Sequence, residues 1–348
     1  MIAGIELGKK YAQVCVKTER MKEIESVTRI AGTEHYRIPV EIDISDQSQL
    51  QELFRKLWKM LSPYGTADSL EYLVFCLEEN TEELRNMLLD IVQVYHIKKE
   101  KIRFLNKEEC FCAYVFQQEE NLLTHQALLI ENREGTLEKF LLQKQSGKCV
   151  CAAKVQDVSE QTLEMIFAEN PISSVFLLGD DFEEEWMQQN RKLLKTGKRV
   201  FVGKNLFVKG ACCRGIELKE KKSSYLYLTE GKVCSSIFLK TEKNGKELEI
   251  PIIKAGDYWY EAGATLEVLL MEDAELEFSI VSALKQEKKT TVICLESLPE
   301  RPKGTTRLQI HLEFKDPNHV RLRIKDLGFG ELFPQSDMVY EGELQWEL

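Results

Sequence analysis

The chain has 348 residues, of which 43% are hydrophobic and 30% are charged, a composition typical of a folded globular protein. This length is sufficient for two or three domains with hydrophobic cores of their own. The formal net charge of −10 argues against the basic character that nucleic-acid-binding proteins need. No apolar run approaches the roughly 20 residues of a membrane-spanning helix.

The ten cysteines are scattered, mostly inside apolar stretches where a free thiol packs as a small hydrophobe. They form no C-x-x-C pair, and neither C-x-C pair has a histidine nearby, which argues against a zinc site. Met1 leads directly into an apolar strand pattern, so we expect no secretion signal. These features predict reduced thiols and a cytoplasmic location.

The first part of the chain begins with residues 1–40, where apolar and polar residues alternate between turns, a pattern that predicts a β-meander. Helical spacing follows after the capping pair Ser45-Asp46. The elements predicted after the meander are, in order, helix 49–61, strand 72–77, helix 82–95, strand 101–105 and helix 108–118.

The pattern then begins again. The elements predicted in this second part are strands 127–130, 137–142 and 149–154, helix 159–168, strand 174–178, helix 182–194, strand 199–202 and helix 206–213. Two successive series of a β-meander followed by alternating helices and strands predict two similar lobes.

Beyond about residue 217 helical spacing disappears, and short alternating strands separated by Gly and Pro predict a β-sandwich. Its predicted strands are 224–228, 233–240, 247–253, 265–271, 275–284, 290–295, 307–314 and 320–325. The domain boundaries that follow are 1–125 for the first lobe, 126–216 for the second, 217–230 for a linker and 231–348 for the β-sandwich.

Several segments resemble motifs of the DnaK-type heat-shock chaperones, which belong to the actin-like ATPase superfamily. The hairpin Ile5–Val16 resembles the first phosphate loop, residues 131–136 (Glu-Asn-Arg-Glu-Gly-Thr) fall on the second, and 178–181 (Leu-Gly-Asp-Asp) fall on the adenosine loop. Residues 295–304 are similar to a segment of the family's peptide-binding β-domain. The motifs occur in the family's order over nearly the whole chain.

This resemblance implies a two-lobed actin-like (ribonuclease H-like) ATPase fold without the outer subdomains, followed by a C-terminal β-sandwich that resembles the chaperone peptide-binding domain. It also implies where a nucleotide would bind. The residues that correspond to that site are Glu6, Gly8, Lys9, Lys10, Glu131, Gly135, Thr136 and Gly179.

Departures from the family pattern indicate that this site is degenerate. The acids that hold metal-bound water correspond to Glu6 and Glu131, each longer than aspartate by one methylene. Arg133 and Glu134 stand where glycines would let the backbone approach phosphate. The water-positioning glutamate falls on Asn106 or Lys107. We therefore expect a pseudo-ATPase with no catalytic residue, no metal and no cofactor, with ATP and magnesium binding as the alternative.

The β-sandwich offers candidate partner-binding residues: Tyr258, Trp259, Tyr260 and Phe329. Aromatic residues are frequent in interface hot spots, although a loop packed on the sandwich explains the 258–260 cluster equally well. We predict a non-catalytic, chaperone-like protein-binding or scaffolding module whose partner is a protein or peptide, not a nucleic acid or a membrane. The alternatives are a slow ATP-dependent molecular chaperone and an actin-like self-assembling protein.

Overall fold

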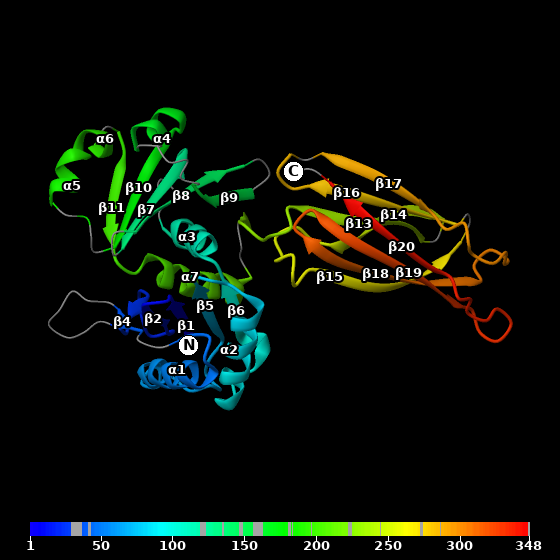
Figure 1. Ribbon diagram of the computed structural model, residues 1–348, viewed down its shortest axis with the longest axis horizontal. Coiled ribbons are helices and arrows are strands. Elements are labelled where there is room, and N and C mark those ends of the chain that lie inside the picture. The colour runs from blue at the N-terminus through cyan, green and yellow to red at the C-terminus, as the bar shows by residue number, and fades with distance from the viewer. Residues whose placement is uncertain are drawn as a thin grey trace. The chain divides into compact units, whose positions relative to one another are not determined.

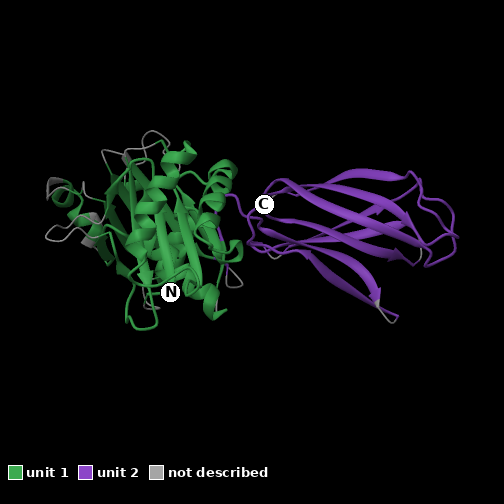
Figure 2. Ribbon diagram, turned by 90° about the horizontal axis from the view of Figure 1, so that it is seen from below, with its two compact units in different colours: residues 1–144, 150–227 green, residues 145–149, 228–348 purple. Residues whose placement is uncertain are grey.

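The computed structural model describes residues 1–28, 37–40, 43–118, 123–133, 136–145, 149–155, 163–179, 182, 184–195, 197–221, 225–243, 245–271, 274–285 and 287–346. Two compact units make up the chain, as Figure 2 shows: residues 1–144 with 150–227, and residues 145–149 with 228–348. Within the described part, no helix is both long and apolar enough to cross a bilayer.

Unit 1 contains a first sheet in the order β3-β2-β1-β5-β6, with β4 paired to β2. Its strands are β1 (Ile2–Leu7), β2 (Tyr11–Lys17), β3 (Glu25–Ser26), β4 (Ile38–Pro39), β5 (Tyr72–Leu77) and β6 (Ile102–Leu105). β1 pairs antiparallel with β2 and parallel with β5, which in turn is parallel to β6.

The second sheet repeats this plan in the order β11-β10-β7-β8-β9-β12. Its strands are β7 (Gln126–Arg133), β8 (Thr136–Lys144), β9 (Cys149–Lys154), β10 (Ile172–Gly179), β11 (Arg199–Gly203) and β12 (Leu226–Leu228). β7, β8 and β9 form an antiparallel meander, and β10 and β11 continue the sheet in parallel from β7. The repeated strand order is the two-lobed actin-like fold.

The helices of unit 1 are α1 (Gln47–Leu61), α2 (Glu82–Val94), α3 (Lys107–Phe116), α4 (Leu163–Glu169), α5 (Glu184–Gln189), α6 (Arg191–Lys195) and α7 (Leu206–Glu220). Figure 1 shows α3 and α7 between the two sheets, and one hydrophobic cluster joins both helices to both sheets. Other clusters pack α1 and α2 on the outer face of the first sheet, and α4 and α6 on that of the second.

Helix α1 illustrates how local sequence specifies these elements. The carboxylate of Asp46 accepts hydrogen bonds from the backbone N–H groups of Ser48 and Gln49 and so caps the first turn. Its buried residues lie on one face: Leu50, Leu53, Phe54, Leu57 and Leu61. This stripe buries against the first sheet, as helical amphipathicity requires.

Unit 2 is a pair of four-stranded antiparallel sheets, ordered β14-β13-β16-β17 and β15-β18-β19-β20. Their strands are β13 (Ser235–Lys243), β14 (Lys246–Ile253), β15 (Gly263–Leu270), β16 (Glu275–Ser282), β17 (Lys288–Cys294), β18 (Thr306–Asp316), β19 (His319–Gly328) and β20 (Val339–Gln345). Alternate residues of β18 and β19 enter a single core.

Some elements differ from the sequence prediction. The strand predicted at 224–228 is β12, which pairs with β9 in the second sheet of unit 1. The predicted linker, 217–230, contains this strand and the last turn of α7. The helix predicted over 182–194 is two helices, α5 and α6, which are separated at Asn190; the side-chain amide of Asn190 donates to the Trp186 carbonyl.

The ten cysteines all lie in the described part and have free thiols. Eight are buried, Cys151 is half-buried and Cys294, at the end of β17, is exposed. Burial raises the pKa of the Cys15 thiol to about 12 and that of Cys234 to about 11. Buried thiols with raised pKa values are poor nucleophiles, which fits packing and not catalysis.

Candidate functional site

Two acids at equivalent strand positions lie close together in the cleft between the lobes. Glu6 is the penultimate residue of β1, and Glu131 lies near the end of β7, the matching strand of the second lobe. Both side chains are buried, with 2% of each residue exposed. These are the acids that the resemblance to the DnaK-type family placed at the positions of its metal-water ligands.

Arg133 connects the two acids. Its Nη1 lies 3.0 Å from Glu6 Oε1 and its Nε lies 2.7 Å from Glu131 Oε1. The guanidinium also lies over the ring of Tyr11, 4.4 Å from the centroid. The Tyr11 hydroxyl donates a 2.9 Å hydrogen bond to the same oxygen of Glu6. A cation of the chain itself therefore lies between the two acids.

Lys107, the first residue of α3, supplies a second cation. Its Nζ lies 3.0 Å from Glu131 Oε2 and 2.9 Å from Glu138 Oε2 on β8. Burial alone would lower the pKa of Lys107, but the carboxylates of Glu131 and Glu138 outweigh it and raise the pKa above its ordinary value. Lys154 on β9 completes the group with a 2.5 Å contact to Glu138 Oε1.

We call these six side chains, Glu6, Lys107, Glu131, Arg133, Glu138 and Lys154, the cleft ion network. Within it, burial raises the pKa of Glu131 to about 7, although the Lys107 ammonium lowers it. Glu138 is less buried, and the hydrogen bond from Lys154 and the charge of Lys107 hold its pKa below the ordinary value against the effect of burial.

The first predicted phosphate loop is also engaged by the chain. The Lys9 backbone N–H donates a 2.8 Å hydrogen bond to Glu78 Oε2, and Lys9 Nζ contacts Glu79 Oε1 at 2.6 Å. A Cβ at Gly8 would lie 2.9 Å from Glu78 Oε2, so a larger residue there would require the Glu78 carboxylate to shift. The Lys10 carbonyl accepts from the Val40 N–H at 2.8 Å. A carboxylate thus takes the amide that a phosphate would use.

One cavity of the cleft is formed by described residues alone. It has a volume of about 150 Å³ and is lined by Lys9, Lys10, Tyr11, Arg37, Glu78, Lys107, Glu131, Arg133 and Glu138. Pockets that bind drug-sized ligands usually have about 300–1,000 Å³, so this cavity is smaller than that range.

Other predicted nucleotide-site residues have structural roles or lie outside the described residues. Gly179 has φ +130°, and a Cβ there would lie 1.9 Å from the Asn132 carbonyl oxygen, so close strand packing requires glycine. The backbone of Thr136 pairs with Arg133 at the start of β8. The side chain of Thr136 and the whole of Glu134, Gly135, Asp180 and Asp181 lie outside the described residues.

The residues of the cleft do not fit magnesium. Among the described residues, no group of three or more His, Cys, Asp or Glu side chains is arranged to hold a metal ion. Glu6 Oε2 is buried without a hydrogen-bond partner, as a metal ligand would be. However, the guanidinium of Arg133 lies 3.0 Å from the other oxygen of the same carboxylate and would repel a second cation.

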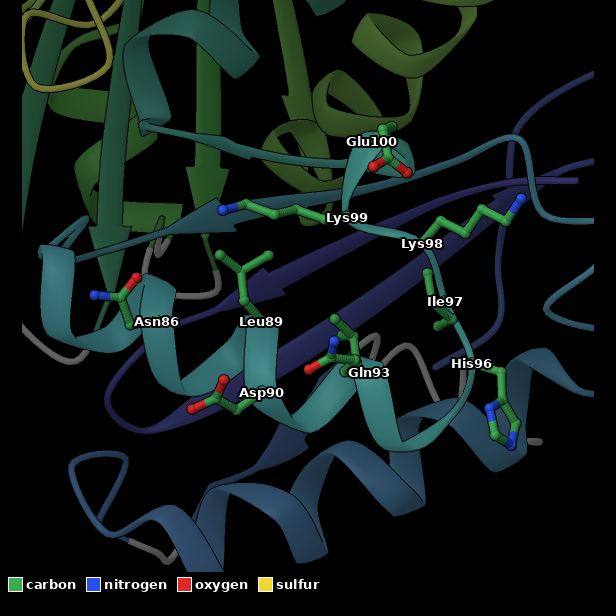
Figure 3. A pocket seen from close by; sticks show the side chains of 10 residues that line it. Asn86, Leu89, Asp90, Gln93, His96, Ile97, Lys98, Lys99 and Glu100 are labelled. Atoms are coloured by element: carbon green, nitrogen blue, oxygen red, sulfur yellow. The ribbon is translucent and has the colours of Figure 1, made fainter.

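A second hollow, of about 840 Å³, lies on the surface of unit 1. Figure 3 shows Asn86, Asp90 and Gln93 projecting from α2 and Lys98 and Lys99 from the segment that follows it. Its ten lining residues include four charged residues of mixed sign and three apolar ones, and it is open to solvent. Small-molecule sites are usually lined predominantly by apolar residues with a few convergent polar groups.

In unit 2, the 258–260 cluster is partly interior. Tyr258 is 6% exposed, stacks on Tyr260 at 5.2 Å and has the Lys232 ammonium 4.4 Å above its ring. Trp259 packs partly against the sandwich core. Tyr258 is thus a packing residue, and Trp259 and Tyr260 keep only part of their surface accessible.

Phe329 lies in a rigid, exposed loop between β19 and β20. The Asp326 carboxylate accepts hydrogen bonds from Arg301 Nη1 and Nη2 at 2.8 and 2.7 Å, and from the N–H groups of Gly328 and Ser336. Burial would raise the pKa of Asp326, but these hydrogen bonds outweigh it and hold the pKa well below its usual range. The anchored loop presents Phe329 and Leu332 to solvent.

Sequence reasoning placed Glu6 and Glu131 at the site but missed Glu78, Lys107 and Glu138 as partners. A signal for one of them exists: the β7–β8 hairpin places Glu131 opposite Glu138, and two adjacent acids, of which Glu131 is buried, require cations nearby. The resemblance placed the family's water-positioning glutamate on Asn106 or Lys107. Asn106 caps α3 by accepting a hydrogen bond from the Glu109 N–H at 2.9 Å.

Comparison with protein families agrees with the division of the chain into two compact units. Residues 27–230, more than half of the chain, match the family described as "Family of unknown function (DUF5716) C-terminal". The chain belongs to this family. Residues 232–346 match a second family, "Domain of unknown function (DUF8552)". The boundary between the matches lies close to residue 227, where the first compact unit ends.

Comparison with curated proteins found no match. Solved structures similar to the chain include the inorganic polyphosphate/ATP-glucomannokinase of Arthrobacter sp. strain KM, with a TM-score of 0.37, 10% identity and coverage of 64% of this chain and 99% of that one. They also include MreB 5 of Spiroplasma citri bound to AMPPNP, with a TM-score of 0.37, 9% identity and coverage of 63% and 97%. The apo ParM protein of pSK41 has a TM-score of 0.38, 8% identity and coverage of 63% and 98%. The two-lobed fold is recognised from the repeated strand order of the two sheets of unit 1 and not from these distant structural similarities.

Proposed function

We propose that unit 1 is a pseudo-ATPase and that the protein works in the cytoplasm as a non-catalytic, chaperone-like protein-binding or scaffolding module. The observation that carries this proposal is the cleft ion network. Its cations, Lys107 and Arg133, lie within 3.0 Å of the acids that would otherwise hold metal-bound water.

The physical reason is electrostatic. Phosphoryl transfer depends on positioning and on metal ions that neutralise charge on the transferred group. In this cleft Glu6 and Glu131 are already neutralised by buried cations of the chain. A bound triphosphate would have to displace Glu78 from the Lys9 N–H, and magnesium would have to approach a guanidinium. The network therefore supports a static role for unit 1.

The β-sandwich supports the protein-binding part of the proposal. Its anchored β19–β20 loop holds Phe329, with 48% of the residue exposed, in a fixed position. Fixed, exposed aromatic residues contribute strongly to protein interfaces because they lose little entropy on binding. The partner we propose is a protein or an extended peptide.

A thermal-shift experiment tests the pseudo-ATPase proposal. The unfolding temperature of the full chain is measured with and without millimolar Mg-ATP, and phosphate release is measured in parallel. A ligand at 100 times its Kd stabilises by about 2.7 kcal/mol, which shifts the midpoint by several degrees. We expect no shift and no release above the buffer rate, because Lys107 and Arg133 already neutralise the acids that would hold metal-bound water.

A clear shift with Mg-ATP, together with turnover, would overturn this proposal in favour of the slow ATP-dependent chaperone. A known actin-like ATPase measured under the same conditions serves as the positive control. The self-assembly alternative has a separate readout, light scattering as a function of protein concentration. Scattering that rises cooperatively above a threshold concentration would favour it.

A further inference from the structure

Strand β11 is an open edge of the second sheet. It pairs in parallel with β10 from Ser174↔Arg199 to Leu178↔Gly203, and Figure 1 shows it at the margin of the sheet. No other described strand pairs with it. An edge strand presents backbone N–H and C=O groups to solvent and can accept a further strand from another chain.

The side chains of this edge are unusually apolar. Val202 has 66% of its surface exposed and Phe201 has 37%. Phe201 stacks on Phe176 of β10 with ring centroids 5.0 Å apart, so its ring is held in place. Edge strands in natural proteins are usually protected by shortness, charged side chains, a proline or a bulge. β11 is short and has Lys198, Arg199 and Lys204 at its ends, but it has no bulge, proline or charge between Val200 and Val202.

The surrounding segment has a charge opposite to that of the whole protein. Between residues 191 and 205 there are six basic residues and no acidic one, in a chain whose formal net charge is −10. The basic residues are Arg191, Lys192, Lys195, Lys198, Arg199 and Lys204. Such a concentration of positive charge attracts and orients an acidic partner.

We infer that β11 is a docking edge for an extended, acidic segment of a partner protein, which adds to the second sheet as a further strand. Main-chain hydrogen bonds to β11 give affinity, Phe201 and Val202 supply apolar contacts, and the basic segment selects acidic flanks. This surface is separate from the cleft ion network and involves none of its residues.

A second copy of this chain is a poor occupant for the same edge. Antiparallel self-pairing centred on Phe201 would place Arg199 opposite Gly203 and Lys198 opposite Lys204, which juxtaposes like charges. The charge pattern therefore favours an acidic segment over self-association.

A labelled peptide tests the inference. The probe is the fluorescein-labelled peptide Glu-Glu-Thr-Val-Ile-Val-Thr-Glu-Glu, and its binding to the full chain is followed by fluorescence anisotropy. Val202→Asp is expected to weaken binding about tenfold or more, because it places a negative charge at the edge that repels the Glu residues of the probe. The matched control is Val94→Asp on α2, where the valine is similarly exposed at 62%, and this variant is expected to bind like the unaltered chain.

Two further peptides separate strand addition from simple charge attraction. Replacing the central Ile of the probe by Pro removes a backbone donor and is expected to abolish binding, while leaving the charge unchanged. Replacing the four Glu residues by Lys is expected to abolish binding through charge repulsion. Equal binding of the Pro and Ile peptides, undetectable binding of the original probe, or equal effects of Val202→Asp and Val94→Asp would each overturn the inference. None of these results bears on nucleotide binding in the cleft.

Discussion

Arg133 contacts, with one guanidinium, the buried carboxylates of corresponding strands in the two lobes. A buried ion pair gives little net stability over an apolar replacement, but removal of one partner leaves a buried charge without compensation. The stability of unit 1 should therefore depend strongly on this residue, although the network as a whole need not be stabilising.

Arg133→Met tests this dependence. At pH 8, where Glu131 is ionised, we expect the free energy of unfolding to fall by about 3–5 kcal/mol, because Glu6 and Glu131 lose a shared cation. Urea denaturation followed by circular dichroism measures the change.

Lys9→Met is the matched control, since Lys9 forms a solvent-exposed pair with Glu79 and should contribute little to stability. Similar losses for both variants would contradict the role assigned to Arg133. Adding Glu6→Gln to Arg133→Met should restore part of the stability by removing one of the uncompensated charges.

The sequence allowed part of this site to be predicted. Strand patterns placed Glu6 and Glu131 near the ends of equivalent strands, and the motif resemblance placed Arg133 at the position of a loop glycine without predicting that its side chain is buried. The roles of Lys107 and Glu78 could not be predicted, because they depend on which atoms meet across the cleft. Lys107 reaches Glu131 only because α3 begins beside the end of β7, a packing result that periodicity does not encode.

At the scale of elements, α3 and α7 cross at unusually short range. An ideal Cβ added to Gly210 on α7 would lie 2.0 Å from the Cys110 carbonyl oxygen on α3. Backbone and not a flexible side chain is the obstacle, so the helices would have to separate to accept any larger residue. Both helices share one core with the two sheets, and such a separation would disturb both lobes.

Gly210→Ala should therefore destabilise the chain. Alanine is favoured over glycine inside a helix by about 1 kcal/mol, but overpacking costs about 1–3 kcal/mol, and here steric conflict with backbone should dominate. Gly203→Ala on β11 is the control, since a Cβ there meets nothing within 4 Å. The comparison is made by thermal unfolding, and a Gly210→Ala variant as stable as Gly203→Ala would refute the explanation.

Most elements could be predicted from periodicity and caps. The strand at 72–77 and the strand at 149–154 have the predicted bounds, and Asp46 and Thr81 cap the helices predicted after them. The failures depend on tertiary structure. The sequence of β12 predicts a strand but does not predict its partner. Only the pairing with β9 assigns β12 to the second sheet of unit 1. β20, at residues 339–345, was not predicted.

For the whole molecule, the two units carry ionisable groups with opposite pKa shifts. Glu131 in unit 1 has its pKa raised from 4.5 to about 7, so the folded state holds a proton that the unfolded state releases. The stabilisation that Glu131 contributes through its raised pKa is fully present below pH 4.5 and is lost as pH rises through about 7. Asp326 in unit 2 has a lowered pKa, so its contribution is present above 3.8 and is lost as pH falls below that value.

The pH dependence of unfolding should separate the two units. Between pH 5 and 8, we expect Glu131→Gln to reduce the fall in unit 1 stability with rising pH, because it removes the titrating group. Asp326→Asn should leave the pH dependence of unit 1 stability unchanged. It should instead destabilise unit 2 by about 3–5 kcal/mol, since Arg301 loses its buried partner. Scanning calorimetry of the full chain measures both. A slope unaffected by Glu131→Gln would contradict the raised pKa.

The distribution of thiols over the two units has a practical consequence. Since eight of the ten cysteines are buried and Cys294 is the exposed one, a maleimide dye should react first on β17 of the β-sandwich. The natural sequence thus provides an attachment point for a fluorophore on the unit that contains the proposed partner loop. Energy transfer from that dye to a labelled partner would report its distance from the sandwich without any engineered cysteine.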